Sequence, residues 1–258
     1  MSMWAMAILL GEQKQRRIKM IEITKIKTYG WGEAIRGMRN SYNSWDKSDS
    51  EFDMSGAGVP VIGPNDLTLM KKLCAAGTAH CKFRRMITVS MDINAPLYWW
   101  KEFDTYKVGT VTNSCSTMHK IAEKEFTHDD FSHEHLVSGW IGKDKNGVVI
   151  NIPGPYEKLQ STINLLNSIR DTYLYVKNTP KEKIDWSCTP SLSAKDIWWQ
   201  MIQLLPSSYN QLRTVMLNYE VLANIYKSRK GHKLDEWKAF CDWIESLPYS
   251  ELITGEDK

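Results

Sequence analysis

The sequence predicts an α+β fold, in which two strands in the first hundred residues precede a largely helical second half. Residues 87–93 alternate apolar and polar side chains at a period of two, which is typical of a strand with one buried face. Residues 21–28 show a similar pattern. Beyond residue 155, apolar residues recur at helical spacing and predict a series of helices.

Local signals predict two helix starts in the first half of the chain. Residues 64–66 (Pro-Asn-Asp) begin a helix at which Asp66 is expected to accept hydrogen bonds from unpaired backbone amides, and Gly77 ends it. Asn94 is expected to cap a second helix that begins at residues 95–96, with proline in its first turn.

The second half is predicted to contain one hairpin and four helices. Residues 145–147 (Lys-Asn-Gly) form a turn that leads into a strand at 148–152, and a helix follows it. Residues 193–196 predict a capping box ahead of the next helix. Pro206 then precedes the longest predicted helix, and a last helix starts near residue 235. The apolar stripe that predicts the longest helix is Leu212, Val215, Met216, Tyr219, Leu222, Ala223 and Tyr226.

Composition indicates an ordinary globular chain of 258 residues, 42% hydrophobic and 24% charged. The formal charge of +3 is small and the basic residues are scattered, so we expect no nucleic-acid partner, while a small anionic ligand remains open. The five cysteines are odd in number and irregularly spaced, which favours reduced thiols used for packing over disulfides or a zinc site.

The first nineteen residues are interpreted as an N-terminal extension. Their apolar run, residues 4–10, is too short to span a bilayer, and basic residues follow it instead of preceding it, unlike a secretory signal. We therefore expect one domain over residues 20–258, no membrane partner and a cytoplasmic location.

The C-terminal part of the chain contains, in order, Leu205, Pro206, Tyr209, Asn218, Leu222, Asn224, Arg229, Glu236 and Trp237. This order resembles the C-terminal signature of the flavin-dependent thymidylate synthases, the thymidylate synthase complementing proteins. Their signature has Leu-Pro, a tyrosine, Asn-x-Arg-x-Leu-x-Asn, an arginine and a Gln-Trp pair. Compared with this signature, the spacing from Pro206 to Arg229 agrees without a gap, while the tyrosine is offset by one residue and the tryptophan lies one residue late. The resemblance implies a central antiparallel sheet packed with long helices and a homotetramer whose sites are shared between subunits.

The resemblance also implies a ligand set. The expected ligands are a pyrimidine deoxynucleotide such as dUMP and FAD, with NADPH and methylenetetrahydrofolate only if the family's activity is retained. Reduced flavin delivers hydride in this family, so no catalytic side chain is named. The flavin candidates are Asn218, Asn224 and His232. The nucleotide candidates are Arg229, Lys107, Ser114 and Ser116.

Three departures from the family pattern predict altered or weakened chemistry. The family's Arg-His-Arg motif has no counterpart, because residues 86–169 contain no arginine. Glu220 stands in place of the arginine between the two asparagines, and Ile202 replaces the arginine four residues before Pro206. A carboxylate beside a bound phosphate is repulsive where a guanidinium is attractive.

The predicted helix after Pro206 would fix how two of these candidates, Asn218 and Arg229, lie relative to each other. Eleven residues are almost three helical turns, so Asn218 and Arg229 are expected on one side of that helix. The alternative is that both are solvated helix residues, and that Lys107 and the two serines belong to an ordinary polar loop.

Residues 128–135 suggest a different class of function. Their three histidines and three carboxylates are donors that zinc, manganese or iron would accept. The spacing does not match a helical ligand pair, and the segment also fits a solvated acidic helix end, so no metal ligand is assigned. Three hypotheses therefore stand: a divergent flavin-dependent enzyme, an inactive nucleotide-binding or structural homo-oligomer, and a metal-dependent hydrolase.

Overall fold

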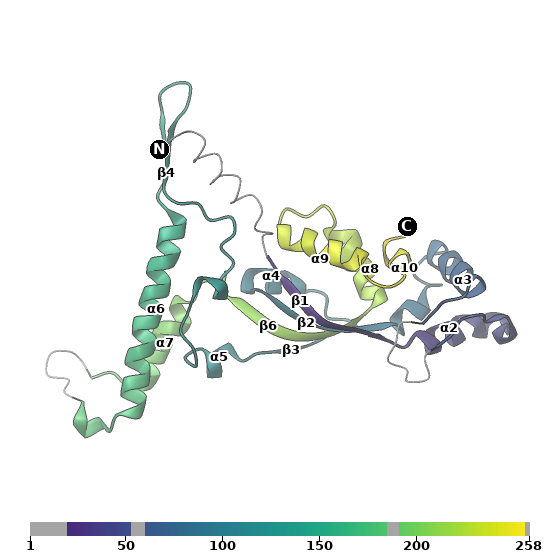
Figure 1. The fold of residues 1–258 in the computed structure, drawn as a ribbon, viewed down its shortest axis with the longest axis horizontal. Coiled ribbons are helices and arrows are strands. Elements are labelled where there is room, and N and C mark those ends of the chain that lie inside the picture. The colour runs from purple at the N-terminus through teal and green to yellow at the C-terminus, as the bar shows by residue number, and fades with distance from the viewer. Residues whose placement is uncertain (1–19, 53–59, 185–190, 256–258) are drawn as a thin grey trace, which may run out of the picture.

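A four-stranded antiparallel sheet forms the centre of the protein (Figure 1). The computed structural model describes residues 20–52, 60–184 and 191–255. The strand order is β1-β2-β6-β3, and the central pair, β2 and β6, is joined along nine residue pairs. The predicted α+β class with an antiparallel sheet is confirmed. The strands are β1 at Glu22–Tyr29, β2 at Thr88–Pro96, β3 at Val111–Ser114 and β6 at Asn210–Asn218.

Helices cover one face of this sheet (Figure 1). They are α4 (Leu97–Phe103), α8 (Tyr219–Arg229) and α9 (Asp235–Glu245). Every second side chain of β2 is buried with them, as the period-two pattern predicted, and these are Val89, Met91, Ile93 and Ala95. The other elements of this body are α2 (Trp31–Arg39), α3 (Pro64–Ala75), α5 (Thr117–Lys120), α10 (Glu251–Thr254) and four 3-10 turns at Asn40–Tyr42, Trp45–Lys47, Lys82–Arg85 and His128–Asp130.

The prediction of a long helix after Pro206 is wrong for residues 210–218, which form the strand β6. Val215 and Leu217 are buried, whereas Leu212 and Met216 are each 46% exposed, so burial follows a period of two. The apolar residues that suggested a helical stripe include side chains from both faces of the strand, some buried and some exposed. Pairing with β2 decides the conformation, because β propensity depends on cross-strand packing that a helical periodicity count does not see.

The start of α4 also differs from the prediction. Asn94 lies within β2, opposite Leu212, and the helix begins at Leu97. Two backbone carbonyls cap it: the amide of Leu97 donates to the Tyr209 carbonyl at 3.0 Å, and the amide of Tyr98 donates to the Ser207 carbonyl at 3.0 Å. The residues just before β6 therefore satisfy amides that a helix start leaves unpaired.

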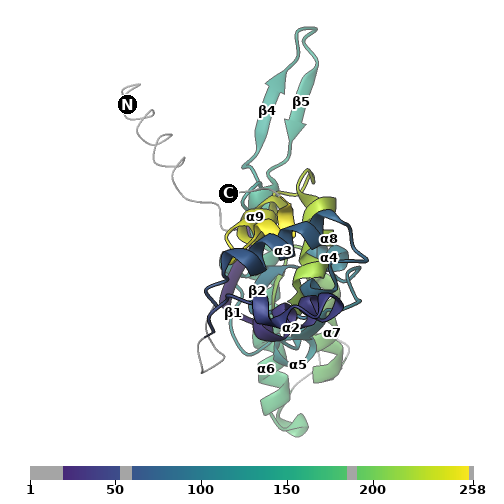
Figure 2. The same cartoon turned by 90° about the vertical axis from the view of Figure 1, so that its right-hand side faces the viewer.

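An arm of two helices and a hairpin stands at one end of the sheet (Figures 1 and 2). It consists of the hairpin β4–β5 (Trp140–Lys143 and Val149–Ile152), α6 (Pro155–Asn178), a 3-10 turn (Lys181–Lys183) and α7 (Ala194–Leu204). The predicted hairpin and the predicted capping box between Ser193 and Asp196 are both confirmed. The arm has its own apolar cluster, which includes Leu166, Met201 and Phe131. Within the described ranges, no helix has the length and apolar character needed to cross a bilayer.

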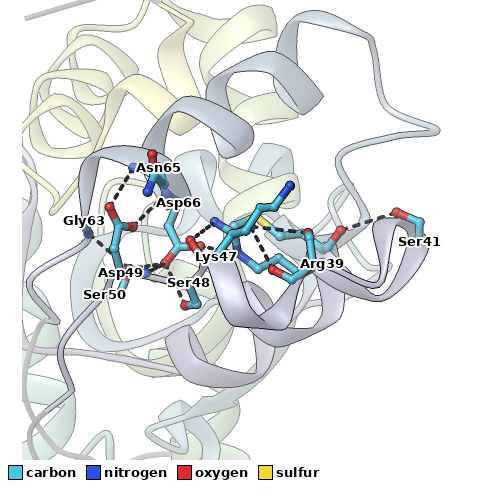
Figure 3. A network of polar contacts seen from close by, with 11 residues as sticks. Arg39, Ser41, Lys47, Ser48, Asp49, Ser50, Gly63, Asn65 and Asp66 are labelled. Carbon is cyan, nitrogen blue, oxygen red and sulfur yellow. Dashed lines mark hydrogen bonds and ion pairs between the residues drawn. The ribbon is translucent and has the colours of Figure 1, made fainter.

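A buried polar network joins α2, α3 and the segment between them (Figure 3). Arg39 Nε donates to Asp66 Oδ1 at 2.6 Å, and both side chains are almost fully buried. The other carboxylate oxygen of Asp66 accepts from the Ser48 and Ser50 hydroxyls, at 2.8 and 2.7 Å, and from the Asp49 amide at 3.1 Å. Burial opposes ionisation, but these hydrogen bonds outweigh it and hold the pKa of Asp66 below its ordinary value.

The predicted extent of α3 is confirmed, but its predicted cap is wrong. Asp49, not Asp66, accepts from the first amides of the helix: Asn65 N lies 2.9 Å from Asp49 Oδ2, and Asp66 N lies 3.0 Å from Asp49 Oδ1 (Figure 3). Asp66 sits in the first turn and faces the buried guanidinium of Arg39. A cap supplied from seventeen residues upstream leaves no signal beside the helix.

We expect Asp66→Ala to lower the free energy of unfolding by about 3–5 kcal/mol at neutral pH, because Arg39 loses its counter-charge while staying buried. Because the pKa of Asp66 is lowered in the folded state, its ionised carboxylate stabilises the wild type at pH values above the ordinary pKa of 3.8. This contribution is lost as the pH falls through the folded-state pKa. Urea unfolding curves should therefore converge at acid pH. Asp46→Asn, a change at an exposed carboxylate of the same segment, should stay within about 0.5 kcal/mol of the wild type; equal losses in both variants would contradict this assignment.

Candidate functional site

The segment after α4 lines a pocket of about 310 Å³, here called the 103–112 pocket. Its lining residues are Phe103, Asp104, Tyr106, Lys107, Thr110 and Thr112. The Lys107 ammonium makes no hydrogen bond or ion pair in the described part of the chain, and the buried Thr110 hydroxyl has no partner either. Buried polar groups are normally satisfied, so an unpaired hydroxyl beside a free cation marks this pocket as a candidate site.

Arg229 lies beside this pocket and is held by groups of the same chain. Its Nη1 donates to Glu102 Oε2 at 2.6 Å, and its Nε donates to the Tyr106 hydroxyl at 2.9 Å. The guanidinium also lies 4.6 Å from the centre of the Trp237 ring, whose Nε1 donates to the same Glu102 oxygen at 2.8 Å. The charge of Arg229 is therefore neutralised by Glu102 of the same chain.

Asn218 lies at the other end of α8 and acts as its N-cap. Its Oδ1 accepts from the Val221 amide at 3.0 Å. Asn218 Nδ2 faces Gly109, where a Cβ atom would come within 2.9 Å of it and where φ is +78°. The expectation that one helix carries both Asn218 and Arg229 is wrong, because Asn218 is the extended N-cap residue before α8, whereas Arg229 is the last residue of that helix.

The remaining flavin and nucleotide candidates are dispersed. Asn224 is exposed on α8, and Ser114 is exposed at the end of β3. Ser116 caps α5 by accepting from the His119 amide, and it lines a second pocket of about 620 Å³. His232 Nδ1 accepts from the Leu234 amide, and its Nε2 lies 3.5 Å from Glu102 Oε2. The chain thus brings Lys107, Asn218, Arg229 and His232 to the segment 102–112, but not Asn224, Ser114 or Ser116.

Glu220 stands in place of an arginine of the family and was therefore expected beside a bound phosphate, but it instead forms an ion pair inside the protein. It is buried, and its Oε2 lies 2.8 Å from Arg84 Nη2. Arg84 also donates from Nη1 to the Leu252 carbonyl at 3.1 Å. This carboxylate therefore joins α8 to the C-terminal end of the body, and its charge is compensated there.

The sequence analysis did not identify Glu102 and Asp104, whose carboxylates form ion pairs with two arginines near the pocket. Asp104 Oδ1 accepts from Arg213 Nη1 at 2.8 Å, and Arg213 lies 4.2 Å from the centre of the Trp100 ring. The pairing of Arg213 could not be anticipated, because β6 had been predicted as a helix. The only signal for Glu102 was its position in the segment that replaces the family's arginines.

In the histidine-rich segment 128–135, the rings of His128 and His133 lie 5.5 Å apart and both contact Tyr156, whereas His135 has a different partner. The His128 ring stacks on Tyr156 at 5.0 Å with an interplanar angle of 8°, and His133 Nδ1 lies 2.8 Å from the Phe131 carbonyl oxygen. His135 Nε2 lies 3.2 Å from Asp235. Among the described residues, no three His, Cys, Asp or Glu side chains are grouped so that they could hold a metal ion.

We expect Asn218→Ala to lower the free energy of unfolding by about 1 kcal/mol, because the first turn of α8 loses its side-chain acceptor. Asn224→Ala removes the same carboxamide from an exposed position of that helix and should change stability by less than about 0.5 kcal/mol. Thermal and urea unfolding of both variants would measure this difference. An equal or larger loss for Asn224→Ala would contradict the capping role assigned to Asn218.

Comparisons with known proteins identify the fold. No protein-family model matches the sequence, and no curated protein matches it. Thymidylate synthase X from Helicobacter pylori, in a crystal structure with FAD and dUMP, is similar with a TM-score of 0.56 at 14% identity, over 91% of this chain and 98% of that one. The UMP/dUMP methylase PolB from Streptomyces cacaoi, bound with 5-Br dUMP, is similar with a TM-score of 0.51 at 12% identity, over 91% of this chain and 94% of that one. The expected fold is thus confirmed: the chain has the α+β fold of the flavin-dependent thymidylate synthases.

Proposed function

We propose that this protein binds a pyrimidine nucleotide at the 103–112 pocket and acts on it with chemistry altered from that of thymidylate synthases. The observation that carries the proposal is the free ammonium of Lys107 at the wall of a pocket that also presents Tyr106 and Thr110. An ammonium binds phosphate as a point charge, and an aromatic ring offers a stacking surface to a base. A volume of about 310 Å³ suits a mononucleotide.

The likeness to solved structures supports the class of ligand. The Helicobacter pylori enzyme was crystallised with dUMP, and the Streptomyces cacaoi enzyme is a methylase of UMP and dUMP. Both matches extend over most of this chain, so the fold that carries nucleotide sites in those proteins is present here in full. The substrate remains our proposal, since one fold hosts many functions.

The charges around the pocket support altered chemistry. Arg229 and Arg213 are both paired with carboxylates, Glu102 and Asp104, so neither guanidinium is available for bidentate phosphate binding in one protomer. Lys107 alone gives weaker and less oriented binding than an arginine pair. Poorly positioned substrate costs rate, because much of enzymatic acceleration comes from orientation.

FAD does not fit the candidate residues of a single protomer. Asn218 already accepts a hydrogen bond at the start of α8, Asn224 is exposed, and His232 contacts Glu102 near the other end of the helix. These three side chains do not share one surface. If flavin binds, groups from another subunit must complete the site, and no step through flavin is assigned to these residues.

A homo-oligomer is part of the proposal, and the arm supports it. The hairpin β4–β5 projects away from the body, and its side chains Ile141, Val148 and Val149 are 73%, 59% and 59% exposed. A two-stranded hairpin with apolar residues in water is marginally stable by itself. Contact with a second copy would bury these residues, and sedimentation of the full chain would show whether it assembles.

We expect dUMP to bind the purified full-length chain, with an affinity that falls as salt is raised, and Lys107→Ala to weaken binding by about tenfold or more. Lys72→Ala removes an equal charge from the exposed side of α3 and should leave the affinity unchanged. Isothermal titration calorimetry would measure both. Absence of dUMP binding, or equal losses in the two variants, would overturn the placement of the nucleotide.

A second candidate is a protein that binds the nucleotide without catalysis, and the paired guanidinium groups favour it. The two candidates differ in two measurements. An active flavoprotein has visible flavin absorption and turns over a pyrimidine nucleotide when the flavin is reduced. A binding protein takes up dUMP but shows neither property.

A further inference from the structure

The Glu102 carboxylate lies among N–H donors from α8, α9 and the turn between them. Its Oε2 atom accepts from Arg229 Nη1 at 2.6 Å and from Trp237 Nε1 at 2.8 Å, and His232 Nε2 lies 3.5 Å from it. The Leu234 amide donates to the other ring nitrogen of His232, Nδ1, at 3.2 Å. The neutral imidazole therefore carries its proton on Nε2, the nitrogen nearer to Glu102. We call these three donor groups the donor cradle.

The donor cradle has the composition of an oxyanion site. A guanidinium, an indole N–H and an imidazole N–H surround one oxygen atom, and charge-assisted hydrogen bonds of this kind also hold phosphate groups. Arg229 Nε donates to the Tyr106 hydroxyl at 2.9 Å, and Tyr106 lines the 103–112 pocket. The cradle thus lies beside the proposed nucleotide site, and a carboxylate of the same chain occupies its donors.

The pair between Glu102 and Arg229 differs from the buried pair between Arg39 and Asp66. Both side chains of the buried pair are at most 4% exposed, and each carboxylate oxygen of Asp66 accepts a hydrogen bond. The side chains of Glu102 and Arg229 are 35% and 17% exposed. Within the part of the chain that the structure describes, Glu102 Oε1 and Arg229 Nη2 make no hydrogen bond. This pair is therefore incompletely satisfied, and water reaches it.

The Glu102 side chain can leave the cradle without a change in the backbone. Its backbone carbonyl accepts from the Thr105 amide at 3.1 Å and from the Thr105 hydroxyl at 2.7 Å, so the end of α4 is held by other contacts. The Trp237 ring is fully buried, and among the described residues Glu102 is the acceptor of its N–H. Departure of the carboxylate leaves this donor unsatisfied unless another anion replaces it. The exchange is therefore favoured by an incoming anion.

From this arrangement we infer that Glu102 is an internal competitor for the donor cradle. Its carboxylate fills the cradle in the unliganded chain, and a phosphate group binds there by displacing it. Glu102 thus determines how tightly the chain binds an oxyanion, and no covalent step is involved. For inorganic phosphate the inference depends on the cradle alone, whereas for the phosphate of a nucleotide it also rests on the proposed function.

Inorganic phosphate is the probe, titrated into the full-length protein by isothermal titration calorimetry at low salt. We expect Glu102→Gln to bind phosphate about tenfold more tightly than the wild type, because Arg229 is released from its ion pair. Glu102→Asp keeps the charge but withdraws it by one methylene group, so its gain should be smaller. Asp242→Asn removes an equal charge from an exposed position of α9 and should bind phosphate as the wild type does.

A double variant tests whether the gain comes from the cradle. Glu102→Gln combined with Arg229→Gln should bind phosphate no more tightly than the wild type. Circular dichroism of each variant verifies the fold, and Glu102→Asp, which retains the counter-charge, supplies the test if Glu102→Gln does not fold. No gain in a folded Glu102 variant, an equal gain in Asp242→Asn, or a gain that persists in the double variant would each overturn the inference. A purely structural role for Glu102 predicts lower stability without any gain in binding.

Titration with dUMP separates this inference from the proposed function. If both hold, Glu102→Gln strengthens dUMP binding and Lys107→Ala weakens it. If the wild type binds dUMP but Glu102→Gln changes the affinity for neither dUMP nor phosphate, the inference alone is wrong. If Glu102→Gln gains phosphate binding while neither it nor the wild type binds dUMP, the proposed function alone is wrong.

Discussion

Antiparallel pairing of β2 with β6 is the constraint on which the rest of the structure depends. The nine-residue ladder ends at Asn218, opposite Thr88, and the chain passes directly into α8. The amide of Tyr219 then donates to the Ile87 carbonyl at 3.0 Å, which fixes the direction in which the helix leaves the sheet. At the other end of the ladder, carbonyls just before β6 cap α4. Both helices that flank the 103–112 pocket are thus anchored to one strand pair.

Ion pairing within the chain decides what charge the site can offer. Arg229 and Arg213 lie near the candidate pocket, and each has a carboxylate from the segment 102–104 within 3 Å. A buried or half-buried arginine needs such a partner, since removing its counter-charge is costly. In this chain, Arg213 and Arg229 therefore take part in ion pairs that stabilise the tertiary structure. Lys107 is left as the unpaired cation at the pocket wall.

The sequence by itself determined the features that depend on neighbouring residues. The alternation at 87–93, the hairpin turn at 145–147 and the capping box at 193–196 each specify their element locally, and the spacing from Pro206 to Arg229 pointed to the fold. Only the tertiary structure decided the features that depend on distant partners. Residues 210–218 form a strand because β2 lies beside them, and Asp49 caps α3 from across a loop. Arg229 is neutralised by a carboxylate 127 positions away in the chain, and a pairing over such a distance leaves no periodic or local pattern to read.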